Sequence, residues 1–199
     1  FSDEKDKYLL ILGRVCPEKG QDIAIHVAKK SGLDLIIAGR IDKDGKSGKH
    51  FKKNIEPFID VDLSRENEKY DAYKNLPQSN SPRIVYVGSV NQFQKRPLYS
   101  RARALLMPVR IHESFGFVIT ESLASGTPVI GFKMGAIPEI IENGKTGYVV
   151  ENVKEMVKAI NHLDDIDPGR CRKIVEEKFS VEKMVENYIS LYKSLVSRT

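Results

Sequence analysis

The sequence has little cysteine and no long hydrophobic run. Its two cysteines, Cys16 and Cys171, are far apart and lack the spacing of metal ligands, so we expect ordinary thiols of a reducing compartment. No apolar run approaches the ~18 residues of a transmembrane helix, and no signal peptide is visible. These absences favour a cytoplasmic protein.

The sequence also lacks a strong excess of one charge. Its 199 residues carry a formal net charge of +5, and the lysines are scattered among nearly as many acids without a dense basic run. A solvated basic surface explains this charge better than nucleic-acid binding does. With 41% hydrophobic and 30% charged residues, the composition is typical of a globular chain, and residues 1–199 are expected to form a single domain.

Several motifs of nucleotide and hydrolase chemistry are missing. The sequence has no Walker lysine motif, no G-x-G-x-x-G after its first expected strand and no G-x-S-x-G. These absences argue against a P-loop nucleotidase, a standard dinucleotide oxidoreductase and a nucleophile elbow. Asp165 and Asp167 resemble a metal-binding Asp-x-Asp pair, but they lie between two expected helices. We therefore predict a solvated loop there and no bound metal.

Short apolar runs alternate with helical periodicity along most of the chain. The alternation predicts an α/β fold, a Rossmann-like open parallel sheet of about six strands with helices on both faces. The strands are expected at 8–12, 34–38, 83–87, 105–108, 128–132 and 148–150, and helices at 21–30, 98–104, 117–126 and 136–142, with closing helices over 153–163, 168–178 and 181–196.

Segment 42–82 has the weakest sequence pattern for secondary structure. Phe51, Ile55 and Phe58 indicate one amphipathic helix. Residues 60–82 are polar and interrupted by two prolines, so we expect an exposed excursion there.

The loops that follow the expected strands are rich in glycine and in unusual charged residues. In an open parallel sheet, ligands bind outside the carboxyl ends of the strands. Loops 13–20, 88–95, 108–116 and 133–138 should therefore converge on one site.

The stretch from Glu113 to Pro128, ESFGFVITESLASGTP, is the centre of this predicted site. Two acids, Glu113 and Glu121, bracket the start of a helix, where free amides and the helix dipole suit an anion such as a phosphate. The amides of Gly116, Phe117 and Val118 would supply these donors; alternatively this is an ordinary helix start with Phe115 and Phe117 in the core. Both interpretations can hold together.

The cations near the predicted site suit phosphates, and the two glutamates suit sugar hydroxyls. Arg14 and Lys19 flank the first loop and suit a diphosphate, although solvated surface cations are the alternative. Glu121 could accept hydrogen bonds from the vicinal hydroxyls of a ribose, or be a surface acid. Glu113 could bind hydroxyls of a second sugar. His112 is equally a ligand or a bystander.

These residues resemble a known family. ESFGFVITE resembles the E-x7-E element of family-four retaining glycosyltransferases of the GT-B fold, and GRVCPEKG resembles their G-R-x-x-x-x-K-G loop. The segment ASGTPVIGFKMGAIPEIIENGKTGYVV and the closing FSVEKMVENYISLY are similar to the family as well. Apart from segment 42–82, the resemblance covers essentially the whole chain.

The resemblance implies the carboxyl-terminal, donor-binding half of such an enzyme. Arg14 and Lys19 would hold the diphosphate and act in the reaction together with Glu113, which faces the donor sugar. Glu121 would hold the ribose and Val90 would lie near the base. The remaining donor-binding positions would be Gly13, His112, Phe115, Gly116, Phe117 and Val118.

The resemblance also implies the partners of the site. The substrate would be a nucleoside-diphosphate hexose, with UDP or GDP as the nucleotide, and neither a cofactor nor a metal would be needed. The acceptor would bind an amino-terminal domain, which is expected to precede Phe1, so the domain alone should transfer little sugar. The intact enzyme could associate peripherally with the inner face of the membrane. The loop PVRIH departs from the Pro-Ser start of many members.

Other functions remain open. A sugar phosphorylase or a nucleotide-sugar epimerase would share the two-domain fold. A stand-alone module that binds or senses a nucleotide sugar is an alternative from another class.

Overall fold

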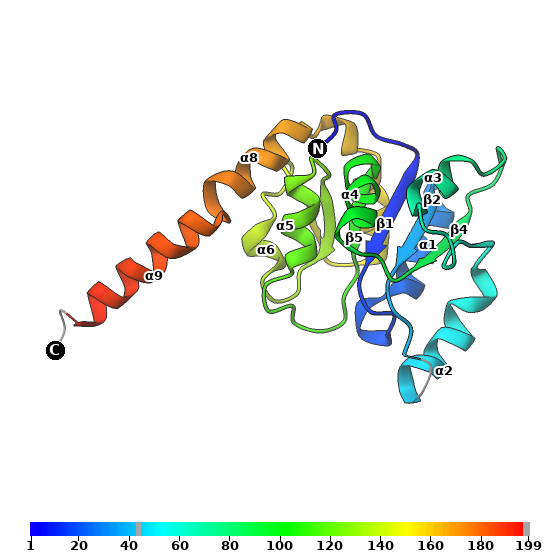
Figure 1. The fold of residues 1–199 in the computed structure, drawn as a ribbon, viewed down its shortest axis with the longest axis horizontal. Coiled ribbons are helices and arrows are strands. Elements are labelled where there is room, and N and C mark those ends of the chain that lie inside the picture. Colours follow the sequence, from blue (N-terminus) through cyan, green and yellow to red (C-terminus); the bar gives the residue numbers. More distant parts are fainter. Residues whose placement is uncertain (43–44, 197–199) are drawn as a thin grey trace.

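The fold is built on a seven-stranded parallel sheet (Figure 1). The computed structural model describes residues 1–42 and 45–196. The predicted domain 1–199 also includes residues 43–44 and 197–199, which lie outside the described residues, and residues 43–44 belong to the predicted segment 42–82. The strand order is β3-β4-β2-β1-β5-β6-β7. The strands are β1 (Tyr8–Leu12), β2 (Asp34–Ala38), β3 (Val61–Asp62), β4 (Ile84–Gly88), β5 (Ala104–Met107), β6 (Val129–Phe132) and β7 (Gly147–Val150).

The central strands are short and almost entirely apolar. The sequences YLLIL, DLIIA and IVYVG are buried along nearly their whole length, as expected for strands that are covered on both faces. The six strands predicted from the sequence are present to within one residue at each end. The prediction of an α/β fold with a parallel sheet is therefore confirmed.

Helices connect successive strands and cover the sheet. On one side α3, α4, α5 and α8 form a continuous row of contacts, and elsewhere α1 contacts α7. Within the described ranges, none of the helices combines the length and the apolar character needed to span a membrane. The helices are α1 (Gln21–Ser31), α2 (Gly45–Asn54), α3 (Lys69–Lys74), α4 (Gln92–Arg101), α5 (Phe117–Ala124), α6 (Ile137–Ile140), α7 (Val153–Ile160), α8 (Pro168–Lys178) and α9 (Val181–Val196).

The order of the strands places a switch point at β1. The chain first builds the sheet outward from β1 through β2, and it later returns to add β5 on the other side of β1. The connections after β1 and β5 therefore leave the same edge of the sheet in opposite directions. The crevice between them is where open α/β sheets bind ligands.

The prediction of an exposed excursion over 60–82 holds for most of its residues but misses two elements. This segment adds β3 to the edge of the sheet beside β4 and then forms α3. Tyr73 on α3 is 8% exposed, and Lys69 is buried because its ammonium donates to the carbonyls of Leu63 and Ser64 at 3.0 and 2.7 Å. A two-residue strand and a six-residue helix are too short to give a periodic sequence signal.

Two predicted helices have different bounds. The helix expected through Phe51, Ile55 and Phe58 ends at Asn54 and is followed by a 3-10 turn, which buries Ile55 and leaves Phe58 exposed. The helix expected at 98–104 is α4, which begins at Gln92. Asn91 starts it with a capping box, because its side chain accepts from the Phe93 and Gln94 amides.

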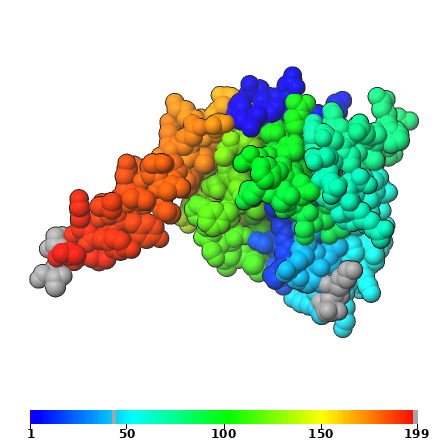
Figure 2. Space-filling model, viewed as in Figure 1, coloured from blue at the N-terminus to red at the C-terminus, as the bar shows by residue number. Residues whose placement is uncertain are grey.

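Helix α9 projects away from the rest of the chain (Figures 1 and 2). All of its residues are exposed, although apolar side chains recur on it at helical spacing. Of the predicted closing helices, α7 and α8 contribute to the core and α9 does not. The exposed apolar residues are Val181, Met184, Val185, Tyr188, Ile189, Leu191, Tyr192, Leu195 and Val196.

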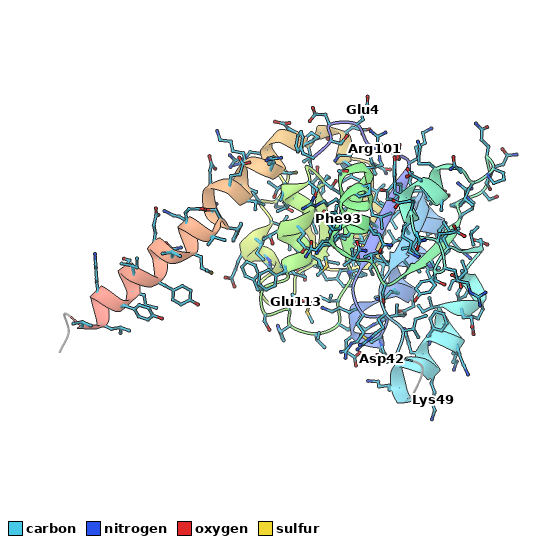
Figure 3. The ribbon with its side chains drawn as sticks, viewed as in Figure 1. Glu4, Asp42, Lys49, Phe93, Arg101 and Glu113 are labelled. Carbon is cyan, nitrogen blue, oxygen red and sulfur yellow. The ribbon has the colours of Figure 1, made fainter. Side chains whose placement is uncertain are left out.

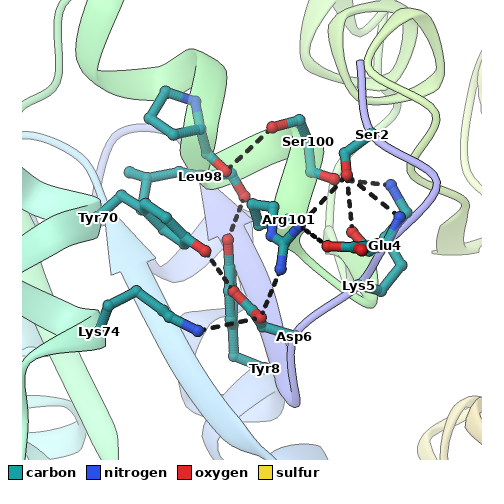
Figure 4. A network of polar contacts seen from close by, with 11 residues as sticks. Ser2, Glu4, Lys5, Asp6, Tyr8, Tyr70, Lys74, Leu98, Ser100 and Arg101 are labelled. Carbon is teal, nitrogen blue, oxygen red and sulfur yellow. Dashed lines mark hydrogen bonds and ion pairs between the residues drawn. The ribbon is translucent and has the colours of Figure 1, made fainter.

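A polar network at the amino ends of the strands fixes the start of the chain (Figure 4). The Asp6 carboxylate accepts from the Tyr70 hydroxyl at 2.6 Å and from the Arg101 guanidinium at 3.1 Å, and it pairs with Lys74 at 3.4 Å. Burial alone would raise the pKa of Asp6, but these hydrogen bonds and charges outweigh burial and lower it. The network joins the segment before β1 to α3 and α4.

We expect Asp6→Asn to lower the free energy of unfolding by about 1–3 kcal/mol at pH 7, because a neutral amide replaces a carboxylate that accepts from charged donors. A carboxyl whose pKa is lower in the folded state stabilises the fold above its unfolded pKa, roughly 3.9, and loses that contribution as the pH falls through the folded value. The difference between variant and wild type should therefore shrink below about pH 4. Urea unfolding at pH 7 and at lower pH measures it.

Glu4→Gln is the matched control, since Glu4 also pairs with Arg101 but its side chain is 82% exposed. Its effect should stay within about 0.5 kcal/mol. An Asp6→Asn deficit that is equally large at pH 7 and pH 3 would contradict the assignment.

Candidate functional site

The connections after β1 and β5 are packed tightly against each other at the switch point. Gly20 has φ 74°, and a Cβ atom on it would lie 2.2 Å from the Pro108 carbonyl oxygen. The Arg110 amide donates to the Glu18 carbonyl at 2.8 Å. A glycine is therefore required at position 20 both for its backbone conformation and for this approach.

Arg110 clamps the same two connections through its side chain. The guanidinium donates to the Pro17 carbonyl at 2.6 Å and forms a two-pronged ion pair with Asp22 on α1, at 2.9 and 2.6 Å. The sequence analysis did not single out Arg110. Its position in PVRIH, next to the predicted His112 and Glu113, was a signal that could have found it.

Glu113 lies where three connections meet. Its carboxylate accepts from the Lys19 ammonium at 2.6 Å, and its carbonyl accepts from the Ala136 amide at 2.8 Å. Gly135 approaches so closely that a Cβ atom on it would lie 2.2 Å from the Glu113 carbonyl oxygen. The structure thus brings together at Glu113 three of the four loops that were predicted to converge, 13–20, 108–116 and 133–138. In Figure 3, Glu113 and Asp42 lie toward the end of the molecule opposite Glu4 and Arg101.

Helix α5 begins directly beside the Glu113 side chain. Gly116 precedes the helix with φ 83°, and a Cβ atom on it would lie 3.2 Å from the Glu113 Cγ. Because glycine has no side chain, Gly116 provides no side-chain cap for the first amides of the helix, and its carbonyl accepts from the Ile119 amide at 2.8 Å. The amides of Phe117 and Val118 at this helix start suit an anion.

The aromatic residues around this helix start are not in the core. Phe117 is 73% exposed and Phe115 is 36% exposed, so the alternative that both are buried is wrong. Their rings contact each other with centroids 5.0 Å apart, and Phe115 also meets Phe179 at 6.0 Å. Val118 is partly buried and packs against the core.

Glu121 on α5 is held by two donors from α4. One oxygen pairs with the Lys95 ammonium at 2.5 Å, and the other accepts from the Tyr99 hydroxyl at 3.0 Å. Burial and the charge of Glu121 raise the pKa of Tyr99, so its hydroxyl remains a donor. Neither donor was predicted. Lys95 ends the predicted site loop 88–95 and Tyr99 lies in the helix predicted at 98–104, whereas α4 carries both residues and presents them to Glu121.

Four described residues that the sequence predicts for the site form no side-chain hydrogen bond or ion pair with the Lys19–Glu113 and Lys95–Glu121 pairs. The Arg14 side chain is 58% exposed, and its guanidinium approaches Asp42 at 3.9 Å. Gly13 lies at the end of β1, where its amide donates to the Ala38 carbonyl at 2.9 Å. Val90 packs partly against the core, and His112 is exposed. Their predicted roles remain predictions.

The charges at the site are balanced in pairs. Each of the two glutamates that bracket the start of α5 has its own lysine, Lys19 for Glu113 and Lys95 for Glu121. The acids therefore do not impose a net negative charge on the helix start between them. An anion can approach the free amides without meeting an unpaired carboxylate.

Other polar features lie elsewhere. Two hollows of about 430 and 420 Å³ are found away from this edge: the first includes Asp6, Lys74 and Arg83 at the amino ends of the strands, and the second lies between α1 and α7. Asp167 of the Asp-x-Asp pair accepts from the Gly169 amide at 2.8 Å and caps α8. Across residues 1–42 and 45–196, no cluster of three or more histidine, cysteine or acidic residues is arranged to hold a metal ion.

Two relatives show how much of a larger protein the chain matches. It is 29% identical over 176 residues to an uncharacterized 41.2 kDa protein in the cps region of Klebsiella pneumoniae, covering 83% of this chain and 48% of that protein. It is 27% identical over 197 residues to the D-inositol 3-phosphate glycosyltransferase of Mycolicibacterium smegmatis, covering 96% of this chain and 41% of that enzyme. The chain spans less than half the length of either relative.

Solved structures share the fold at low sequence identity. Alr3699/HepE of Anabaena, solved in complex with UDP, superposes with a TM-score of 0.71 at 18% identity, covering 96% of this chain and 49% of that one. The carboxyl-terminal domain of the group 1 glycosyl transferase LpcC from Francisella tularensis has a TM-score of 0.64 at 20% identity, covering 89% and 88%. The fold is that of one half of a GT-B enzyme.

The family comparison agrees with the motifs. The family model described as glycosyl transferases group 1 matches residues 1–180. The resemblance of E-x7-E and G-R-x-x-x-x-K-G is thereby confirmed, and this chain belongs to the group 1 glycosyl transferases.

Proposed function

We propose that the chain is the donor-binding domain of a retaining glycosyltransferase that moves a hexose from a nucleoside-diphosphate sugar to an acceptor glycan, lipid or small molecule. The observation that carries this proposal is the Lys19–Glu113 ion pair beside the start of α5, at the switch point of the sheet. Membership of the family supports transferase chemistry, and a neighbour of the same fold binds UDP.

The diphosphate would compete with Glu113 for Lys19. The Lys19 ammonium is a mobile point charge with three donors, so it can turn from the carboxylate to a phosphate oxygen. The amides at the start of α5 and the exposed Arg14 would bind the remaining phosphate oxygens. These groups would stabilise the leaving diphosphate without a metal ion, and the released Glu113 oxygen would face the hydroxyls of the donor sugar.

The acceptor would bind outside the described residues, so the chain alone should bind a nucleotide but transfer little sugar. Glu121, held by Lys95 and Tyr99, would accept hydrogen bonds from the ribose. Val90 and Gly13 would line the donor site, and His112 and Phe115 would border the sugar. Peripheral membrane association of the intact enzyme remains part of the proposal.

We expect calorimetry to detect binding of at least one of UDP, GDP and ADP. Lys19→Met should weaken it by roughly tenfold or more, because it removes a charge-assisted contact and leaves Glu113 unpaired near the phosphates. Arg14→Ala should weaken every nucleoside diphosphate that binds. Arg103→Ala is the control, since Arg103 pairs with Asp164 just before β5, at the opposite edge. Failure of all three nucleotides to bind at millimolar concentration would refute the site.

Alanine substitutions of the two glutamates should affect different properties of the protein. Glu121→Ala should weaken the nucleoside diphosphate by roughly tenfold and leave pyrophosphate unchanged, because it removes only hydrogen bonds to the ribose. Glu113→Ala should leave free nucleotide affinity equal or higher, because it frees Lys19, but should damage sugar transfer by the intact enzyme. Calorimetry with both ligands measures the first pair of effects. Equal losses of nucleotide affinity in the two variants would contradict this division.

A further inference from the structure

The Glu121 carboxylate uses one donor on each of its oxygens. Lys95 pairs with Oε1 at 2.5 Å and the Tyr99 hydroxyl donates to Oε2 at 3.0 Å. An ionised carboxylate offers about four lone-pair sites, so roughly two remain for other donors. Two such sites on one fixed carboxylate suit a pair of neighbouring hydroxyl groups.

The exposure of the three side chains shows which of them a ligand can reach. Tyr99 is 2% exposed as a residue, the Lys95 side chain is 15% exposed and the Glu121 side chain is 33% exposed. The Glu121 side chain is therefore the most exposed of the three, and Tyr99 is almost fully buried. A ligand can reach the carboxylate directly.

The backbone around these donors is itself fixed. Asn91 sets the start of α4, which determines where Lys95 falls on the helix. At the other end of the helix, the Thr127 hydroxyl donates to the Tyr99 carbonyl at 2.5 Å and so joins α4 to the segment after α5. The two donors are thus presented to Glu121 from a helix that is anchored at both ends.

We propose that Lys95 and Tyr99 are positioning residues that hold Glu121 for the 2′ and 3′ hydroxyls of a ribose, and that they thereby make the site prefer ribonucleotides to deoxyribonucleotides. This inference rests on the proposed function and adds a specificity to it. Removing either donor lets the carboxylate rotate, so the second hydroxyl is no longer matched.

A purely structural tie between α4 and α5 is the competing explanation. Loss of such a tie would destabilise both helices and weaken every ligand at the site to the same extent. Loss of positioning changes the ratio between ligands that differ only in one hydroxyl. The ratio of the two dissociation constants therefore separates the two roles.

The test measures binding of UDP and 2′-deoxy-UDP, of the corresponding guanosine and adenosine pairs, and of pyrophosphate to the chain by calorimetry. In the wild type we expect the ribonucleotide to bind roughly tenfold more tightly or better. In Lys95→Met and in Tyr99→Phe this preference should fall to within about threefold. Pyrophosphate affinity should stay unchanged in Tyr99→Phe, whereas Lys95→Met leaves Glu121 unpaired and should weaken pyrophosphate and both nucleotides through the lost charge. Tyr99→Phe removes a single oxygen atom, so it keeps the test decisive if Lys95→Met does not fold.

Matched controls exist at the opposite edge of the sheet. The Tyr73 hydroxyl donates to the Asp34 carboxylate at 3.1 Å, and Lys74 pairs with Asp6 at 3.4 Å. Tyr73→Phe and Lys74→Met remove the same kinds of contact from another carboxylate, and both should retain the preference of the wild type.

Three results would overturn the inference in distinguishable ways. If both site variants keep the preference for ribose, or if Tyr99→Phe loses pyrophosphate affinity in proportion, Lys95 and Tyr99 do not position Glu121. If the wild type binds UDP and 2′-deoxy-UDP equally, the role of Glu121 toward ribose is wrong while the diphosphate site stands. If the wild type binds none of the nucleotides, the proposed function fails as well.

Discussion

The site depends on a charge constraint at the start of α5. Two glutamates flank a position that suits an anion, and unpaired they would repel a diphosphate. The structure resolves this conflict by giving each acid its own lysine, Lys19 from the connection after β1 and Lys95 from α4. The amides at the start of α5 then remain available to an anion, and the acids keep lone pairs for hydroxyl groups. Binding of phosphate and binding of sugar can therefore occupy adjacent positions.

The backbone enforces this arrangement through close approaches that side chains would prevent. Gly20 lies against Pro108 and Gly135 lies against Glu113, each at a distance that excludes a Cβ atom. These contacts hold the connections after β1, β5 and β6 close together, so the Lys19 ammonium lies within reach of the Glu113 carboxylate. The arrangement costs conformational freedom in three loops, which the rigid sheet beneath them offsets.

The sequence predicts the sheet well and the site in part. Continuous apolar runs such as 8–12 and 34–38 identify buried parallel strands, and loop positions at their carboxyl ends follow from topology. The predicted convergence of loops 13–20 and 108–116 follows from that topology, but the ion pair between Lys19 and Glu113 was not predicted. The partners of Glu121 depend on how α4 packs against α5, which no local pattern reports. The strand β3 within segment 60–82 was missed for a similar reason, since it is stabilised by β4 and not by its own two residues.

A crystal structure of this chain with UDP would show whether the diphosphate binds at the start of α5. We expect the Lys19 ammonium to move from Glu113 to a phosphate oxygen and the amides at the start of α5 to contact the diphosphate. Glu121 should accept from the ribose while it stays bound to Lys95 and Tyr99. A nucleotide bound instead in the basic hollow beside Lys74 and Arg83, with the Lys19–Glu113 pair unchanged, would contradict it.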